Sequence, residues 1–292
     1  MNLRRRALAT AIGAAISGLS IGDVGCGSTG SKRFAFEARA GGIERDSAEP
    51  YTFTNPKGWE VTLTRADVTI GPVYVNVLAP LRQAAMLLRL LPEARADDLH
   101  LGEGRVVGEV LGQVSFDALS PALVPFGATG TITEEQVRTA DIWFWPPPGT
   151  AAETTNIDAP SVDLAGEAAR GAERVRFRGT LIFDEAWASD AQPGERSALP
   201  MTEIRKVRGV PASFFPTEGG ALEIRVDVRA LFRGADFTSL AASPEDEDGT
   251  KILVQSKRGK LTTDQVMRNV FQGLRSSSGT YAVRWVPLPK ER

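Results

Sequence analysis

The sequence predicts an all-β fold, specifically an antiparallel β-sandwich with about two helical additions. Short segments alternate apolar and polar residues with a period of two, and turn-forming residues recur between them. Only two segments carry apolar residues at helical spacing. Alternation of this kind is typical of a sheet with one dry face and one wet face. We expect roughly ten strands in all.

The first half of the chain holds the clearest strand signal. Trp59, Val61 and Leu63 alternate with polar residues directly after the turn sequence at 55–58 (NPKG). Further strands are expected from Phe34, over 68–70 and 73–77 on either side of Gly71-Pro72, over 105–116 and over 138–145.

Residues 80–91 (PLRQAAMLLRLL) are expected to form a helix, because their apolar residues recur at helical spacing and Pro80 suits a first turn. Such a stripe normally faces a core, so this helix is expected to close one end of the sandwich. A helix that contacts a partner or a membrane is the alternative.

The second half begins with a segment at 149–170 that is rich in Ala, Thr, Pro and Asp, which predicts a long exposed loop. A capping box at Thr262 and Gln265 predicts a helix over 263–274. Strands are expected over 175–183, 222–228, 252–255 and 281–285.

The N-terminal segment has the pattern of an export signal. Three arginines at 4–6 precede an apolar run over 7–22, and small residues lead to Cys26, the single cysteine of the chain. This pattern resembles a bacterial lipoprotein signal peptide, with Val24 and Gly25 in the small positions and Asp23 where leucine is usual. The resemblance implies that Cys26 becomes a lipidated N-terminus held on a bilayer. The arginines also resemble a twin-arginine export signal.

Other interpretations of this segment stay open. The run at 7–22 is short for a membrane-spanning helix, which needs about 20 residues. Cleavage without lipidation and an ordinary buried thiol at Cys26 are further alternatives. The lipoprotein interpretation divides the chain into a signal peptide at 1–25, a lipidated cysteine with a flexible tether at 26–33, and a single β domain at 34–292.

Composition excludes several classes of function. The chain carries 34 basic and 36 acidic residues. Removing the signal takes away three arginines and one aspartate, which leaves a net charge of −4. That balance provides no basic patch, so nucleic acid is not an expected partner. A single cysteine rules out intramolecular disulfides, and nothing in the sequence indicates a cofactor.

The best candidates for ligand binding are Trp143 and Trp145, which lie two residues apart in an expected strand and so share one face. Exposed tryptophans on a β-sandwich can stack on sugars, whereas buried ones belong to the core. Asp98, His100 and Glu103 are candidate metal ligands, although a single imidazole favours a polar loop over a metal site here. Residues 245–249 (EDEDG) match half of a calcium loop, or an acidic solvated turn.

Segments 58–66 and 70–75 resemble strands of uncharacterised lipoproteins from Gram-negative bacteria. This resemblance implies a location in the envelope and a β fold. The signal, the tether, the strand alternation and the scarcity of catalytic residue types lead us to expect a lipoprotein of the outer membrane or cell surface with a non-catalytic binding or structural role. A membrane held through the lipid anchor and a glycan or envelope protein are its expected partners. The alternatives are a carbohydrate- or metal-binding module, and an envelope hydrolase that uses carboxylates.

Overall fold

The computed structural model describes residues 31–45, 50–78, 105–144, 160–183, 205–254 and 265–288. The described strands are β1 (Arg33–Gly42), β2 (Tyr51–Thr54), β3 (Glu60–Ile70), β4 (Val73–Asn76), β5 (Val106–Val110), β6 (Val114–Asp117), β7 (Val124–Pro125), β8 (Gly130–Thr133), β9 (Val137–Trp143), β10 (Val162–Arg170), β11 (Glu173–Leu181), β12 (Lys206–Phe214), β13 (Gly220–Val226), β14 (Lys251–Ile252) and β15 (Tyr281–Pro287). The described helical segments are the 3-10 helices η3 (Val228–Phe232) and η4 (Phe237–Ala242) and the α-helix α3 (Gln265–Leu274). The prediction of an all-β fold is confirmed.

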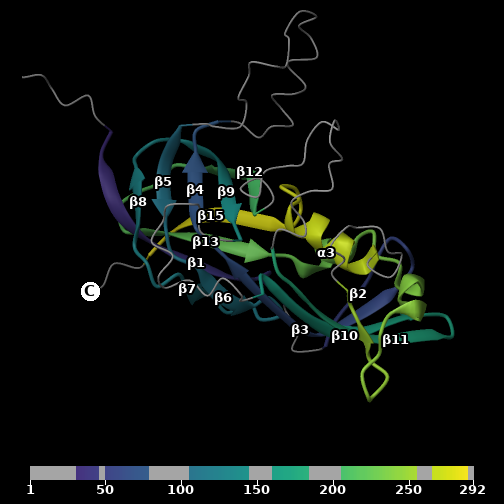
Figure 1. Cartoon of the computed structure of the whole chain (residues 1–292). Helices are drawn as coiled ribbons and strands as arrows, with labels where there is room; N and C mark the ends of the chain where they lie inside the picture. The colour runs from purple at the N-terminus through teal and green to yellow at the C-terminus, as the bar shows by residue number, and fades with distance from the viewer. Residues whose placement is uncertain are drawn as a thin grey trace, which may run out of the picture. The chain divides into compact units, whose positions relative to one another are not determined.

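The larger sheet closes on itself (Figure 1). Its strands follow the order β13-β15-β12-β9-β4-β5-β8-β1, and β1 pairs again with β13. The short strand β7 adds to β1 from outside this ring. The first half of β1 pairs with β8 and its second half with β7, while β13 runs along the other edge.

The finer prediction, an antiparallel two-sheet sandwich, is not confirmed. Most neighbours in the closed sheet are antiparallel, but β1 pairs with β13 and β12 pairs with β15 in parallel. A second sheet is present, yet the larger sheet closes through the β1–β13 pairing instead of remaining an open layer.

The smaller sheet has six strands, in the order β14-β11-β10-β3-β2, with β6 also paired to β3. Trp59, Val61 and Leu63 point into its core side as the alternation predicts. The phase then changes, and Ala66, Val68 and Ile70 are the buried residues further along the strand. A β-bulge opposite the Ala165–Gly166 step causes this change, because one extra residue in β3 reverses which parity faces inward.

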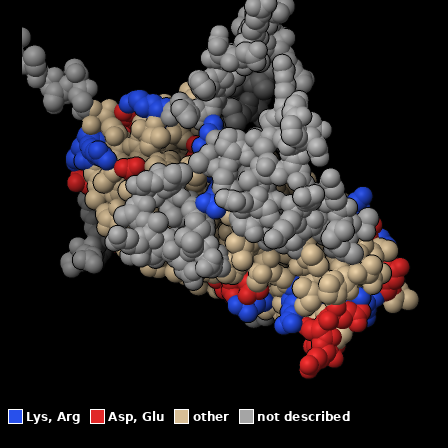
Figure 2. Space-filling model, viewed as in Figure 1, with Lys and Arg blue, Asp and Glu red and all other residues tan. Residues whose placement is uncertain are grey.

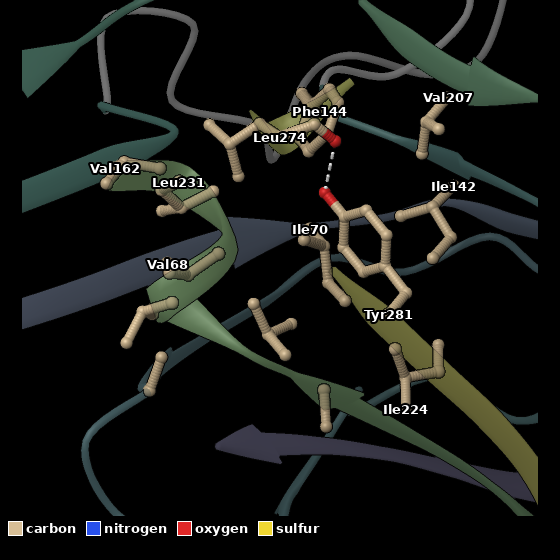
Figure 3. Close-up of a cluster of buried hydrophobic side chains, with 14 of the residues drawn as sticks. Val68, Ile70, Ile142, Phe144, Val162, Val207, Ile224, Leu231, Leu274 and Tyr281 are labelled. Atoms are coloured by element: carbon tan, nitrogen blue, oxygen red, sulfur yellow. Dashed lines mark hydrogen bonds between the residues drawn. The ribbon is translucent and has the colours of Figure 1, made fainter. Parts of the chain in front are cut away.

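One continuous core joins both sheets and the helical segments. Figure 3 shows Val68 of β3, Ile142 of β9, Leu231 of η3 and Leu274 of α3 converging from four different elements. Tyr281 enters the same cluster from β15, and its hydroxyl donates a hydrogen bond to the main-chain oxygen of Leu274 at 2.6 Å. This buried hydrogen bond connects the C-terminal strand to the end of α3.

Aromatic side chains connect the inner face of the smaller sheet to the short helices. Phe177 of β11 contacts both Phe232 and Phe237, with ring centroids 5.9 and 5.1 Å away, and those two rings contact each other at 6.1 Å. Trp59 contacts Phe237 at 5.5 Å. One face of this sheet is therefore dry, and the other remains available to solvent.

The prediction of a long loop over 149–170 is wrong for residues 162–170. Residues 162–170 form β10, which pairs with both β3 and β11 in the smaller sheet. The Ala, Gly and charged residues of this segment favour a loop, but main-chain pairing along both edges of β10 stabilises a strand. Strand preference depends strongly on such tertiary context. Residues 149–159 lie outside the described residues, as does the helix predicted over 80–91.

The C-terminal helix prediction is confirmed over the described part, where α3 spans Gln265–Leu274 and buries Val266, Met267, Val270 and Leu274. None of the described helices has the length and apolar composition needed to cross a membrane.

Candidate functional site

The outer face of the smaller sheet carries a dense set of polar side chains. Strand alternation directs the residues between the buried ones toward solvent. The outward residues are Thr62, Thr64, Arg65, Asp67, Thr69, Ser115, Asp117, Asp163, Glu167, Arg174, Arg176, Arg178 and Thr180. Figure 2 shows basic and acidic side chains intermixed at the lower right of the view, where Figure 1 places β10 and β11.

Three arginines form a row along β11, at alternate positions 174, 176 and 178. Arg174 pairs with Glu167 at 2.7 Å, and Arg178 pairs with Asp246 at 3.0 Å. Between them, Arg176 lies 3.7 Å from the carboxylate of Asp248. More than half of each arginine side chain is exposed, so these ion pairs contribute little to stability. Their donors remain accessible to a ligand.

A fourth arginine, Arg65, lies on β3 across the sheet from this row. Its guanidinium binds Asp67 at 2.7 Å and Asp163 of the neighbouring β10 at 3.0 Å. The hydrogen bond to Asp67 raises the pKa of Arg65, with the charge of Asp163 acting in the same direction. This cluster therefore presents fixed charges of both signs at neutral pH.

The loop that precedes β14 forms one rim of this face. Gly249 adopts a φ of +79°, a conformation that favours glycine. Thr250 donates its main-chain N–H to the carboxylates of Asp246, at 2.9 Å, and Asp248, at 3.0 Å. A hydrogen bond with Asp246 and the hydrogen bonds from Thr250 lower the pKa of the Asp248 carboxyl.

These contacts bear on the half calcium loop considered at 245–249. In the structure the segment is an acidic turn in which Asp248 faces Arg176 and Asp246 faces Arg178, while Glu245 pairs with Lys251. Among the described residues, no group of three His, Cys, Asp or Glu side chains is placed to hold a metal ion.

Three adjoining hollows follow this face, with volumes of about 480, 440 and 380 Å³. The first two share Ala165 and Arg178, and the last two share Arg65 and Asp163. We call this continuous depression the polar groove. Its walls combine guanidinium donors, carboxylate acceptors and threonine hydroxyls, which together can hydrogen-bond a ligand rich in hydroxyl groups.

Trp143, the one described member of the predicted tryptophan pair, is only 8% exposed. The ammonium group of Lys206 lies 4.9 Å from the centroid of its ring. A ring so covered presents little area for stacking on a sugar. Two residues earlier on β9, burial raises the pKa of Asp141, whose carboxylate accepts a 2.8 Å hydrogen bond from the main chain of Gly209.

The other predicted site residues lie outside the described residues. They are Cys26, Asp98, His100, Glu103 and Trp145.

Sequence reasoning missed the polar groove. The alternation of arginine with Val175 and Phe177 along β11 was a usable signal, because it places every arginine on the wet face. The carboxylates that complete the groove come from β3, β6, β10 and the loop at 245–250, and no local pattern connects those segments.

In comparison with known proteins, no protein-family model, curated protein or solved structure matches the chain.

Proposed function

We propose that the chain is an exported, lipid-anchored protein of the bacterial cell envelope with a non-catalytic binding role. The support for export and anchoring is the arginine-led apolar segment that ends at Cys26. The described β structure begins at Arg33, only seven residues after this cysteine. That spacing suits a tether between a lipid anchor and a domain. The location that we propose for the domain is the outer membrane, on its periplasmic or external side.

The ligand we propose is a glycan of the envelope, bound in the polar groove. The observation that carries this proposal is the groove itself, in which arginines, carboxylates and threonines alternate over three adjoining hollows. Sugar hydroxyls both donate and accept hydrogen bonds, so a surface with both kinds of partner suits them. Binding through this groove replaces the stacking on Trp143 that the sequence suggested.

Incorporation of labelled palmitate tests the anchor. The wild-type protein is expected to become labelled in a bacterial host, and Cys26→Ser is expected to abolish the label. Labelling that persists in the variant would contradict lipidation at Cys26.

A glycan array followed by titration tests the binding role. Arg65→Ala removes a guanidinium shared by two hollows, and a loss of about tenfold in affinity is expected if it makes a charge-assisted hydrogen bond to the ligand. Arg138→Ala, at an exposed position on β9 outside the groove, is the matched control and should bind as wild type does. A blank array, or equal losses in both variants, would refute the proposal.

A further inference from the structure

The start of β1 and the ends of several other strands lie at one end of the closed sheet. The main-chain oxygen of Lys32 accepts a hydrogen bond from the N–H of Glu134 at 2.7 Å, beside the turn between β8 and β9. The Lys32 ammonium also pairs with Glu218, in the turn between β12 and β13. From the β8–β9 turn, Gln136 donates to the carbonyl of Phe214 at 3.0 Å.

We call this the tether end, because the chain enters it from Cys26. Its described residues are 31–33, 77–78, 105–106, 133–137, 214–220 and 287–288.

Exposed apolar side chains are concentrated at the tether end. Among the described residues, four large apolar side chains are strongly exposed. Leu78 (45% exposed), Val106 (49%) and Phe215 (50%) lie at the tether end. The fourth, Leu111 (55%), follows the opposite end of β5.

The three residues belong to neighbouring positions around the closed sheet. Val106 pairs with Asn76 of β4, and Leu78 follows that strand. Phe215 follows β12, which is separated from β4 only by β9. With strands spaced about 4.8 Å apart, the three side chains span an arc of about 15 Å. They therefore form one apolar edge.

The length of the tether limits how far this edge can lie from a bilayer. Arg33 is the seventh residue after Cys26, and a fully extended chain covers at most about 3.6 Å per residue, or about 25 Å over these seven steps. If Cys26 carries the lipid, as the proposed function requires, the tether end is the part of the described domain held nearest to the membrane surface.

We infer that the tether end rests on the lipid bilayer, with Leu78, Val106 and Phe215 inserted among the headgroups. This inference depends on the proposed lipid anchor. The strands that lead into the smaller sheet leave from the opposite end of the closed sheet, after Gly42 of β1 and before Val73 of β4. This orientation turns the polar groove away from the anchoring membrane, where a ligand of the envelope can reach it.

Charge at the tether end indicates which lipids are needed. Its charged side chains among residues 31–33, 105–106, 133–137 and 214–220 are three basic and three acidic ones, namely Lys32, Arg33, Arg105, Glu134, Glu135 and Glu218. Their charges cancel, so contact is expected to depend on apolar insertion and not on anionic headgroups. Vesicles of phosphatidylcholine alone are therefore a sufficient test surface.

A fluorescent probe at single sites tests this orientation in the full-length lipidated protein. The chain has one cysteine, and lipidation consumes its thiol, so an introduced cysteine is the only one open to labelling. Phe215→Cys and Val106→Cys place an environment-sensitive nitrobenzoxadiazole dye at the apolar edge. Leu111→Cys is the matched control, equally exposed but at the far end of β5. All three sites are half exposed, so folding should survive labelling.

In phosphatidylcholine vesicles we expect about a twofold rise in emission at positions 106 and 215, with quenching by spin-labelled lipid, and neither effect at position 111. Vesicle flotation of the same samples reports anchoring separately. Protein that floats while the dyes at 106 and 215 stay in water, or while position 111 is quenched equally, would overturn the orientation and leave the anchor intact. Protein that fails to float would refute the anchor and the orientation together.

Discussion

The side chain of Asn55 is predicted to hold together the turn between β2 and β3, and its replacement tests that role. Asn55 is only 4% exposed. Its amide nitrogen donates to the main-chain oxygens of Phe232, at 3.1 Å, and Ala235, at 2.8 Å. Its amide oxygen accepts from the main-chain N–H groups of Lys57, at 2.9 Å, and Trp59, at 3.1 Å. One side chain thus connects this turn to the segment between η3 and η4.

The expected cost follows from these four hydrogen bonds. Each contributes a net of about 1 kcal/mol, and the partners left buried lose solvation as well. The N–H of Lys57 is near solvent and can recover a bond to water, which reduces the total. Asn55→Ala is therefore expected to lower the free energy of unfolding by about 3 kcal/mol. Asn55→Asp retains the acceptor but turns a carboxylate toward two carbonyl oxygens, so it should destabilise at least as much.

Urea unfolding followed by tryptophan fluorescence measures this loss, and Trp59 in the same turn provides a local signal. Thr54→Ala, at the exposed neighbouring position, is the control and should change stability by no more than about 0.5 kcal/mol. A loss below about 1 kcal/mol for Asn55→Ala would refute the proposed role of the four bonds. So would an Asn55→Asp variant that is clearly more stable than Asn55→Ala.

Three further substitutions test the core and the sheets. Tyr281→Phe removes the hydroxyl bonded to Leu274 and should cost about 1 kcal/mol, measured by urea unfolding. Burial raises the pKa of Tyr281 in the folded state, so its contribution is complete below the ordinary tyrosine pKa and is lost as pH rises through the folded value. Wild type should therefore lose more stability above about pH 10 than the phenylalanine variant, and identical alkaline profiles would contradict this. Gly166→Ala would place a Cβ 2.4 Å from the main-chain oxygen of Thr62, so it is expected to lower the free energy of unfolding by about 2 kcal/mol. A melting temperature equal to that of the wild type would contradict this clash. Arg225 is 9% exposed and donates hydrogen bonds to two main-chain oxygens. Arg225→Met is therefore expected to lower the free energy of unfolding by about 3 kcal/mol, and Arg225→Lys should recover part of this loss in the same urea assay.

Local periodicity predicted much of the strand content correctly. Phe34, Phe36 and Ala38 are buried on β1 as their spacing indicates, and Leu222 and Ile224 are buried on β13. Such alternation is visible in the sequence because it depends only on neighbouring residues along one strand.

The β-bulge in β3 shows the limit of that method. A period of two predicts which residues share a face only while the strand stays regular, and one extra residue reverses the assignment. Val68 and Ile70 face the core, but they do not continue the alternation of Trp59, which buries odd-numbered residues. They are buried because the bulge shifts the inward side of β3 to even-numbered residues.

Gln265 shows a second limit. The sequence assigns it to a capping box, an arrangement local to the start of α3. Its predicted partner, Thr262, lies outside the described residues. In the structure the amide of Gln265 bonds across to the segment between η3 and η4, accepting from the N–H of Asp236 at 2.9 Å and donating to the oxygen of Gly234 at 3.0 Å. The local sequence pattern does not indicate these tertiary contacts.

The candidate site divides in the same way. The arginine row on β11 is encoded locally, whereas the acidic partners arrive from β10 and from the loop at 245–250. Trp143 lies on a strand as predicted, but it is only 8% exposed and its ring contacts Lys206 from a distant part of the chain. Residue type and spacing therefore indicate which chemical groups a strand carries, but not whether other parts of the chain cover those groups.

The sequence by itself determined the all-β class, the positions of most described strands and many of the apolar side chains that they bury. Only the tertiary structure decided that β1 pairs in parallel with β13 and closes the larger sheet, and that β3, β6, β10, β11 and the loop at 245–250 together build the polar groove. The physical reason is that alternation specifies which face of a strand is apolar but not which strand lies beside it. That choice depends on main-chain hydrogen bonds and packing between residues far apart in the chain.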